Sequence, residues 1–243
     1  MVVEPKLLIL FTTLFSLVIV SSCKKDDDTN PNKDARNYEV KTVQVPDAMS
    51  QSDDPGARQA ASYINMVNGM AGYGGMMTPP SKCSPVTNFK DGTEDIYVWE
   101  INEGNTHCTF TLSVTETATK YFWEMIIDGT MEGQVFNNFT YLKAEEAKDG
   151  SSSSFTVYDP ENGGILMTMS WYESGGATHF TFEVPDDVMM SVVVNADGSG
   201  SVEVKDWQNG QYVLEFRAEW DASGHGQWWE YDETGAIWNQ GSW

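Results

Sequence analysis

Residues 95–243 alternate apolar and polar side chains in short runs that are broken by Gly next to Asp or Asn. A period of two is typical of a β-strand, in which successive side chains point to opposite faces. In residues 211–220, for example, Leu214 and Phe216 share one face and Glu215 lies on the other. Because each such run has one face suited to burial and one suited to water, the pattern predicts antiparallel strands around a single core.

Tight turns separate these runs. Gly accepts the positive φ that two-residue hairpin turns require, and Asp or Asn commonly precedes it. Strands joined in this way predict an all-β fold, an antiparallel up-and-down meander that curls into a closed or partly open barrel. A strongly curved or two-layer sheet is the alternative, and the absence of βαβ alternation argues against a parallel sheet. The turn pairs are Asp149-Gly150, Asn162-Gly163, Asp197-Gly198 and Asn209-Gly210.

One short helix is predicted before the sheet. Asp53 or Asp54 is a suitable N-cap, and Pro55 suits the first turn. The following apolar residues have near-helical spacing, and a group of glycines from residue 69 onward is expected to end the helix. We therefore expect residues 38–94 to form a helix and a Gly/Pro-rich loop that pack on the β domain of residues 95–243. The apolar stripe consists of Ala57, Ala60, Ala61, Ile64, Val67 and Met70.

The amino-terminal segment has the features of a secretory signal. An apolar run over residues 7–22 follows Lys6, ends in small residues before Cys23, and is too short for a comfortable membrane span. Val20-Ser21-Ser22-Cys23 resembles the lipobox of the bacterial lipoprotein family. The resemblance implies that residues 1–22 are a signal peptide and that Cys23 is acylated on its thiol and new amine, with diacylglycerol and a fatty acid such as palmitate. Several acyl chains anchor a protein stably, so the lipid bilayer is the first expected partner.

Residues 23–37 are predicted to form a disordered tether, because their charged and polar side chains bury too little apolar surface to offset chain entropy. The run Lys24-Lys25-Asp26-Asp27-Asp28 resembles the acidic tag that follows the lipid cysteine in Bacteroidota-type surface lipoproteins. That resemblance implies display on the outer face of the outer membrane. The alternative is the periplasmic face, with the charge run acting only as a solvated linker.

The net charge excludes one class of partner, and the cysteine content predicts a disulfide. The formal net charge is −22 and stays so after signal removal, because Glu4 and Lys6 leave together. Such a charge repels nucleic acid, so a nucleic-acid partner is excluded. In an oxidising compartment Cys83 and Cys108 are predicted to form a disulfide, with a buried free thiol at Cys108 as the alternative.

Aromatic residues crowd the last third of the chain, and Trp228, Trp229 and Trp238 are the predicted ligand-binding residues. Their flat faces and polar edges suit apolar or sugar-like ligands, whereas packing inside the sheet is the structural alternative. Neighbours on a strand face opposite sides, so one of Trp228 and Trp229 should point outward. The Gly and Trp spacing of residues 198–243 also resembles MORN-type hairpin repeats, which implies hairpins whose aromatic side chains pack across strands.

No catalytic residues, cofactor or metal site is predicted. The three histidines lack zinc spacing, and Asn195–Val202 with Asp206 mimics a calcium loop only partly, because strands flank it. The sequence therefore favours an outer-membrane surface lipoprotein that acts as a non-enzymatic binding or interaction module. Its candidate partners are an apolar or carbohydrate ligand and an envelope protein. A purely structural surface lipoprotein is the first alternative, and a glycan hydrolase that uses two carboxylates is the second.

Overall fold

The computed structural model describes residues 22–23, 38, 40–80, 83, 86–88 and 94–243. The proposed signal peptide lies outside these residues apart from Ser22, and so does the proposed tether apart from Cys23. The lipobox and the acidic tag therefore stay predictions. Among the described helices, none combines the length and the apolar character of a membrane span.

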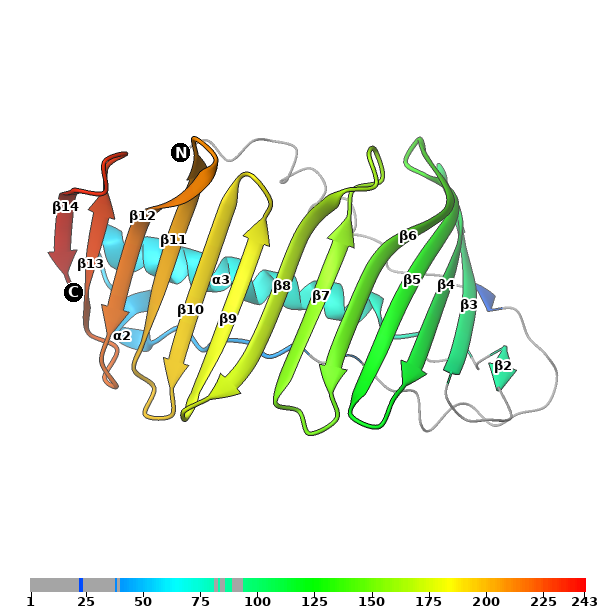
Figure 1. The fold of residues 1–243 in the computed structure, drawn as a ribbon, viewed down its shortest axis with the longest axis horizontal. Coiled ribbons are helices and arrows are strands. Elements are labelled where there is room, and N and C mark those ends of the chain that lie inside the picture. Colours follow the sequence, from blue (N-terminus) through cyan, green and yellow to red (C-terminus); the bar gives the residue numbers. More distant parts are fainter. Residues whose placement is uncertain (1–21, 24–37, 39, 81–82, 84–85, 89–93) are drawn as a thin grey trace.

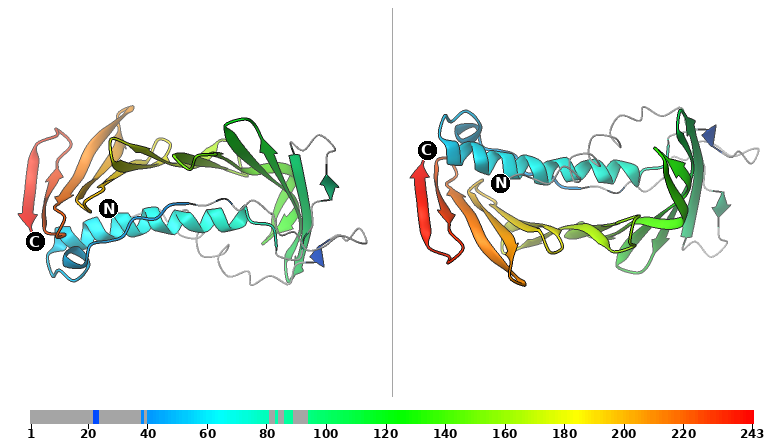
Figure 2. Two further views of the ribbon diagram at one scale, coloured as in Figure 1. Left: turned by 90° about the horizontal axis from the view of Figure 1, so that it is seen from below. Right: turned by 90° about the horizontal axis from the view of Figure 1, so that it is seen from above.

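The β domain is one antiparallel meander in which each strand from β3 to β14 pairs with the next in chain order. Two short strands, β1 (Ser22–Cys23) and β2 (Thr87–Asn88), also pair with β3. Because β3 and β14 do not pair with each other in the described part of the chain, the sheet stays open. It curves strongly at both ends (Figure 1, Figure 2). The predicted all-β meander is thus confirmed, in its partly open and curved form. The twelve long strands are β3 (Glu94–Glu103), β4 (Thr106–Glu116), β5 (Lys120–Met131), β6 (Gln134–Ala147), β7 (Ser152–Tyr158), β8 (Ile165–Ser174), β9 (Ala177–Val184), β10 (Val188–Asn195), β11 (Gly200–Gln208), β12 (Gln211–Trp220), β13 (Gly226–Tyr231) and β14 (Ile237–Ser242).

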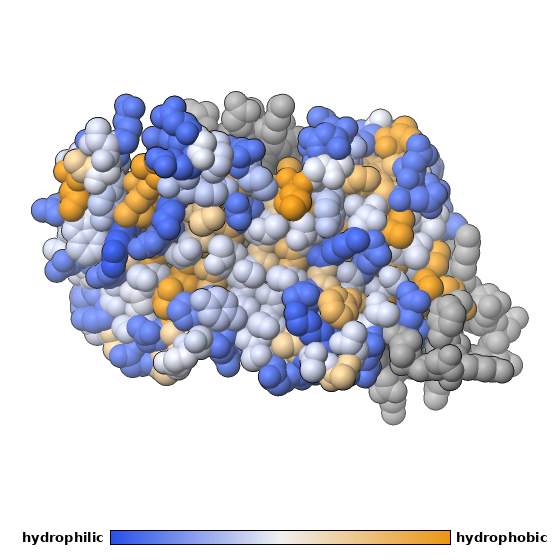
Figure 3. All heavy atoms as spheres, in the orientation of Figure 1, coloured by the Kyte–Doolittle hydropathy of each residue, from blue (hydrophilic) through white to orange (hydrophobic). Residues whose placement is uncertain are grey.

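Burial alternates along these strands as the sequence pattern predicts. On β4, Cys108, Phe110 and Leu112 are buried, whereas Thr109 and Thr111 between them are only half-buried. The buried set lines the concave face. The convex face, which Figure 3 shows, is mainly polar with scattered apolar side chains.

Helix α3 (Pro55–Met76) lies in the concavity and crosses the strands (Figure 2). Asp54 caps it, since its side chain accepts a hydrogen bond of 3.0 Å from the Ala57 amide, and Pro55 occupies the first turn. The helix continues through Gly69 and Gly72 and ends at Met76, directly after Gly74 and Gly75, so only the last members of the predicted glycine group mark its end. Gly69 and Gly75 lie on its exposed side, so they weaken helix propensity without opening a gap in the buried stripe. A second, four-residue helix, α2 (Asp47–Ser50), precedes it.

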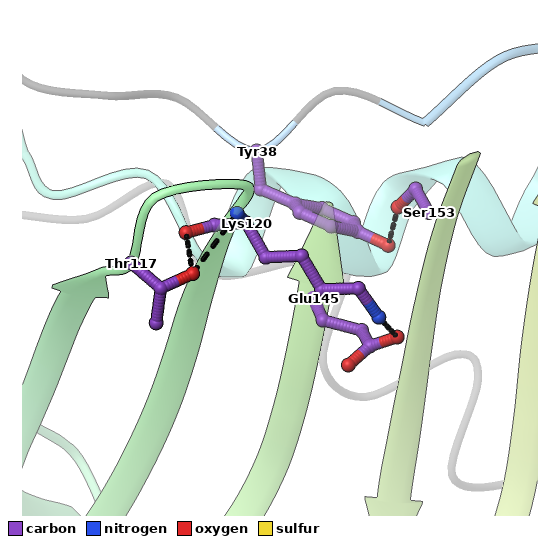
Figure 4. A network of polar contacts seen from close by, with 5 residues as sticks. All are labelled: Tyr38, Thr117, Lys120, Glu145 and Ser153. Carbon is purple, nitrogen blue, oxygen red and sulfur yellow. Dashed lines mark hydrogen bonds and ion pairs between the residues drawn. The ribbon is translucent and has the colours of Figure 1, made fainter. Parts of the chain in front are cut away.

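The segment before α2 is fixed to the concave side at two points. The Asn68 side chain on α3 accepts from the Val43 amide at 2.7 Å and donates to the Val43 carbonyl at 2.8 Å. Tyr38 reaches β7, where the Ser153 hydroxyl donates to the Tyr38 hydroxyl (Figure 4). The Tyr38 ring also packs edge-on against Trp123 at 5.1 Å between ring centroids. Tyr38 and Val43 are therefore part of the folded domain.

Candidate functional site

The concave face, where a barrel would hold its ligand, is occupied by the protein's own side chains. Ile64, Val67 and Met70 of α3 are almost fully buried there. Two aromatic pairs join the helix to the sheet: Tyr63 lies 5.4 Å from Phe216 and Tyr73 lies 5.9 Å from Phe155, measured between ring centroids. A ligand inside the curved sheet would have to displace α3.

A shallow hollow of about 440 Å³ lies outside this concavity, between the tip of the β8–β9 hairpin and the tip of the β10–β11 hairpin. Its lining is mostly backbone and small side chains, including Gly175, Gly176 and Ala196. It lacks the apolar walls with convergent polar groups that are typical of small-molecule sites.

Trp228 faces the concave side and is not available to an external ligand. Only 4% of its surface is exposed. A Cβ atom added to Gly56 on α3 would overlap its ring, and one added to Gly241 on β14 would lie 2.7 Å from its Nε1. Trp228 therefore joins the helix to the last two strands of the sheet, in accordance with the packing alternative.

Trp229 and Trp238 remain accessible. Trp229 sits on the convex side of β13, opposite Arg217 on β12 and Gln240 on β14, and is half-buried. Trp238 is 64% exposed and lies at the irregularity in the β13–β14 pairing. We call these two residues, together with the half-buried Tyr231 and the exposed Ile237, the C-terminal aromatic surface.

Two other tryptophans explain the Gly and Trp spacing of the C-terminal segment. The Trp220 ring lies directly over Gly200 on the neighbouring strand, and its indole N–H donates to the Gly198 carbonyl at 3.0 Å. In the same way the Trp243 ring lies over Gly226, and its indole N–H donates to the Gly224 carbonyl at 2.6 Å.

Hairpins β11–β12 and β13–β14 thus share the same cross-strand packing of a tryptophan on a glycine. In each, a glycine early in the first strand leaves room for a tryptophan at the end of the second. Sequence reasoning expected aromatic residues to pack across strands but missed that their partners are glycines. The recurrence of a glycine pair before each hairpin was the available signal.

Several strand glutamates could supply the two carboxylates of a glycoside hydrolase, and most of them are engaged with neighbours. The candidates are Glu100, Glu124, Glu183, Glu215, Glu219 and Glu230. Glu124 forms an ion pair with Lys143 at 3.2 Å, and Glu219 pairs with Arg217. Burial, followed by hydrogen bonding and repulsion from the Glu183 carboxylate, raises the pKa of Tyr212 to about 12; its hydroxyl donates to that carboxylate at 2.9 Å.

Glu215 is different. Burial raises its pKa above the ordinary glutamate value, and the charges of Asp206 and Glu230 raise it further. One of its carboxylate oxygens is shielded from solvent. A carboxyl group that binds its proton more tightly than usual, near a second carboxylate, is the feature that a general acid needs.

The partial calcium loop is an ordinary turn. The Asp197 carboxylate accepts from the Ser199 amide at 2.9 Å and from the Ser199 hydroxyl at 2.6 Å, and these bonds lower its pKa. Asp206 lies near the far end of β11. Within the described ranges, no three His, Cys, Asp or Glu side chains are arranged to hold a metal ion.

The predicted disulfide between Cys83 and Cys108 is wrong. Cys108 is a free thiol, buried on the inner face of β4 opposite Gly129 of β5. Burial, together with the charge of Asp128, raises its pKa, which keeps the thiol protonated. Cys83 is buried in the segment after α3. The alternative of a buried free Cys108 is the one that holds, because alternation with Phe110 and Leu112 directs its side chain into the core.

No protein-family model matches the chain, and no curated protein matches it significantly in sequence. The assignment of function therefore rests on the residues and their geometry.

Proposed function

We propose that this protein is a lipid-anchored outer-membrane surface lipoprotein that acts as a non-enzymatic binding module through its C-terminal aromatic surface. The observation that carries the proposal is the contrast between a concave face filled by α3 and a Trp238 side chain that is 64% exposed. Because burial of aromatic side chains is favourable, the exposed Trp238 and the half-buried Trp229 on the same hairpin favour a ligand at this surface. The chemistry of these rings fits an apolar or sugar-like ligand.

The position of this surface suits a tethered receptor. Tyr38 is held at β7, whereas the aromatic surface lies on β13 and β14. Neighbouring strands are about 4.8 Å apart, so six to seven strand spacings separate the two along the curved sheet by roughly 30 Å. Cys23 lies in β1, which pairs with β3, whereas β14 lies at the other edge of the sheet. A lipid at Cys23 would therefore leave the C-terminal edge free to meet external ligands.

Intrinsic tryptophan fluorescence of the full-length protein in detergent, titrated with a panel of glycans, tests the binding proposal. We expect saturable quenching or a spectral shift that Trp229→Ala abolishes. Tyr172→Ala is the matched control, because Tyr172 is an exposed aromatic residue on β8, remote from the C-terminal surface. A response that survives both Trp229→Ala and Trp238→Ala would contradict the proposed surface.

The anchor is tested separately with Cys23→Ala. We expect the substituted protein to leave the membrane fraction, and we expect protease added to intact cells to degrade the unsubstituted protein. Retention of Cys23→Ala in the membrane would refute lipidation at this residue. Protection from protease with normal anchoring would indicate the periplasmic face instead.

Glycan hydrolysis is the second candidate function. It is favoured by the raised pKa of Glu215, to which the nearby negative charge of Glu230 contributes. Release of reducing ends from a glycan panel, abolished by Glu215→Gln and by Glu230→Gln, would support it. Binding without turnover supports the non-enzymatic module. The absence of both binding and turnover would leave the purely structural role.

A further inference from the structure

The two edges of the sheet differ in how they are covered. β1 and β2 both pair with β3, so part of that edge is occupied. Within the residues described, no strand pairs with the outer side of β14. An uncovered edge strand presents backbone N–H and C=O groups on which another chain can form a further strand.

The alternation of an antiparallel ladder identifies the outward groups. Trp243 exchanges two backbone hydrogen bonds with Gly226, at 3.1 and 3.2 Å. The alternate residues Ser242 and Gln240 therefore turn their N–H and C=O groups away from β13. The Gln240 amide instead donates to the Asn239 side chain at 3.1 Å, a local bond that a strand carbonyl can replace.

β14 lacks two of the usual means of protecting an edge, although its pairing with β13 is irregular at Trp238. Residues 237–243 include no charged residue and no proline, which are the common means of blocking edge pairing. Ile237 and Trp238 are 51% and 64% exposed.

Strand β12 is equivalent to β14 in its tryptophan and glycine contacts, but both of its sides are paired. β12 and β14 end in equivalent tryptophans, Trp220 and Trp243, each held over a glycine and bonded to a turn carbonyl. The side of β12 that corresponds to the open side of β14 pairs with β13. There Trp220 lies opposite Gly226, and Ala218 lies opposite Trp228.

Applying the β12–β13 register to β14 predicts which residues a strand paired with β14 would carry. A strand added to β14 would place a glycine opposite Trp243 and an aromatic residue opposite Gly241, which is equivalent to Ala218. The Trp228 ring of β13 already covers Gly241. The register, and not free space over Gly241, therefore indicates an aromatic residue at this position.

Charge restricts the partner further. Asp221, Glu230, Asp232 and Glu233 surround this end of the sheet, and the nearby Arg217 is paired with glutamates on both sides. With a net charge of −22, a second copy is repelled and a cationic segment is attracted.

We propose that the open edge of β14 accepts an extended, cationic segment of a partner protein as an added antiparallel strand. Backbone hydrogen bonds to Gln240 and Ser242 provide the attachment, and a glycine opposite Trp243 with an aromatic residue opposite Gly241 provides the selectivity. This interaction goes beyond the binding proposed for the aromatic surface, because it depends on backbone groups at the edge and not on the rings of Trp229 and Trp238.

The test uses the full-length protein in detergent and a synthetic peptide with the sequence of residues 226–231 in which lysine replaces the glutamine and the glutamate. We expect saturable binding, and we expect the peptide to slow hydrogen exchange of the Gln240 and Ser242 amides at least tenfold. A peptide with glutamate at both replaced positions is the charge control and should bind at least tenfold more weakly.

Two variants separate edge pairing from other contacts. Ser242→Pro removes an outward N–H without touching the bonds to β13 and should weaken peptide binding at least tenfold, whereas Ser242→Ala keeps that N–H and should bind as the unsubstituted protein does. Unchanged exchange at Gln240 and Ser242 in the saturated unsubstituted protein would overturn the proposal. Equal peptide affinity of the Ser242→Pro and Ser242→Ala variants would also overturn it. So would equal affinities of the lysine and glutamate peptides, or dimerisation of the protein without peptide binding. If the unsubstituted protein binds the peptide but none of the glycans, the proposed function is contradicted and the proposal for the β14 edge is not.

Discussion

The centre of the sheet and its C-terminal hairpin are built by different means. Between β4 and β10, alternate large side chains are buried together, and Phe155 of β7 stacks on Tyr73 of α3, so burial follows directly from the period of the strands. In β13 and β14, burial depends on individual tryptophans placed over glycines. The centre resembles an ordinary hydrophobic core, whereas the C-terminal hairpin is thin, partly exposed and specific in its contacts. The part of the molecule that contributes least to the core is thus the part that offers a surface for recognition.

The largest difference between the two regions is expected from removal of one aromatic side chain in each. Phe182 on β9 is fully buried, so Phe182→Ala should lower the free energy of unfolding by about 3–5 kcal/mol through lost burial and a cavity. Trp238→Ala, at an exposed position, should change it by no more than about 0.5 kcal/mol. Urea denaturation measures both, and equal losses would show that the C-terminal hairpin is part of the same core.

The Trp–Gly contacts are expected to tolerate no added carbon. A Cβ at Gly226 would overlap both the Glu219 carbonyl oxygen and the Trp243 ring, so Gly226→Ala should cost about 1–3 kcal/mol and shift the Trp243 emission. Gly104→Ala is a control for strain without crowding, because Gly104 has a positive φ and open space around it. Equal emission spectra of Gly226→Ala and the unsubstituted protein would show that the ring does not lie over Gly226.

Two glycines of the same helix should respond with opposite signs. Gly56→Ala places a methyl group within the Trp228 ring and should lower stability by about 1–3 kcal/mol. Gly69→Ala meets no neighbour within 4 Å and should raise stability by up to about 1 kcal/mol through helix propensity. If thermal unfolding shows that both substitutions stabilise, α3 does not pack on Trp228.

The smallest effect is electrostatic and depends on pH. Because the pKa of Glu215 is raised in the folded protein, folding favours its protonated form. The stability that this group contributes is complete below the ordinary glutamate pKa and is lost as pH rises through the folded value. Glu215→Gln should therefore stabilise the protein at neutral pH, by less than about 1 kcal/mol after solvent screening, and not at pH 4. Melting temperatures at the two pH values measure this difference, and a gain of equal size at both would exclude titration of Glu215 as its cause.

The meander could be predicted from sequence because period-two alternation and Gly-containing turns are local signals. The length of α3 could not, since its glycines disfavour a helix locally while burial of Met70, Tyr73 and Met77 on the sheet stabilises it. The same limit explains Cys108, whose alternation with Phe110 correctly indicated burial but not whether a second thiol lies within reach.

The candidate site was predicted only in part. Alternation required Trp228 and Trp229 to face opposite sides, but which one faces inward depends on Gly56, a residue far away in the sequence that leaves space for the ring. The Trp–Gly contacts and the open edge of β14 could not be predicted, because they depend on which strands pair and in which register. Residue spacing alone does not define either.

Native-state hydrogen exchange of α3 in the full-length protein tests most directly whether the helix permanently fills the concave face. We predict that the amides of Ile64, Val67 and Met70 exchange as slowly as those of β8 and β9, because the helix and the sheet share one core. Exchange of these helix amides at least a hundredfold faster than that of the strands would show that α3 leaves the concavity, and would contradict the assignment of recognition to the outer surface.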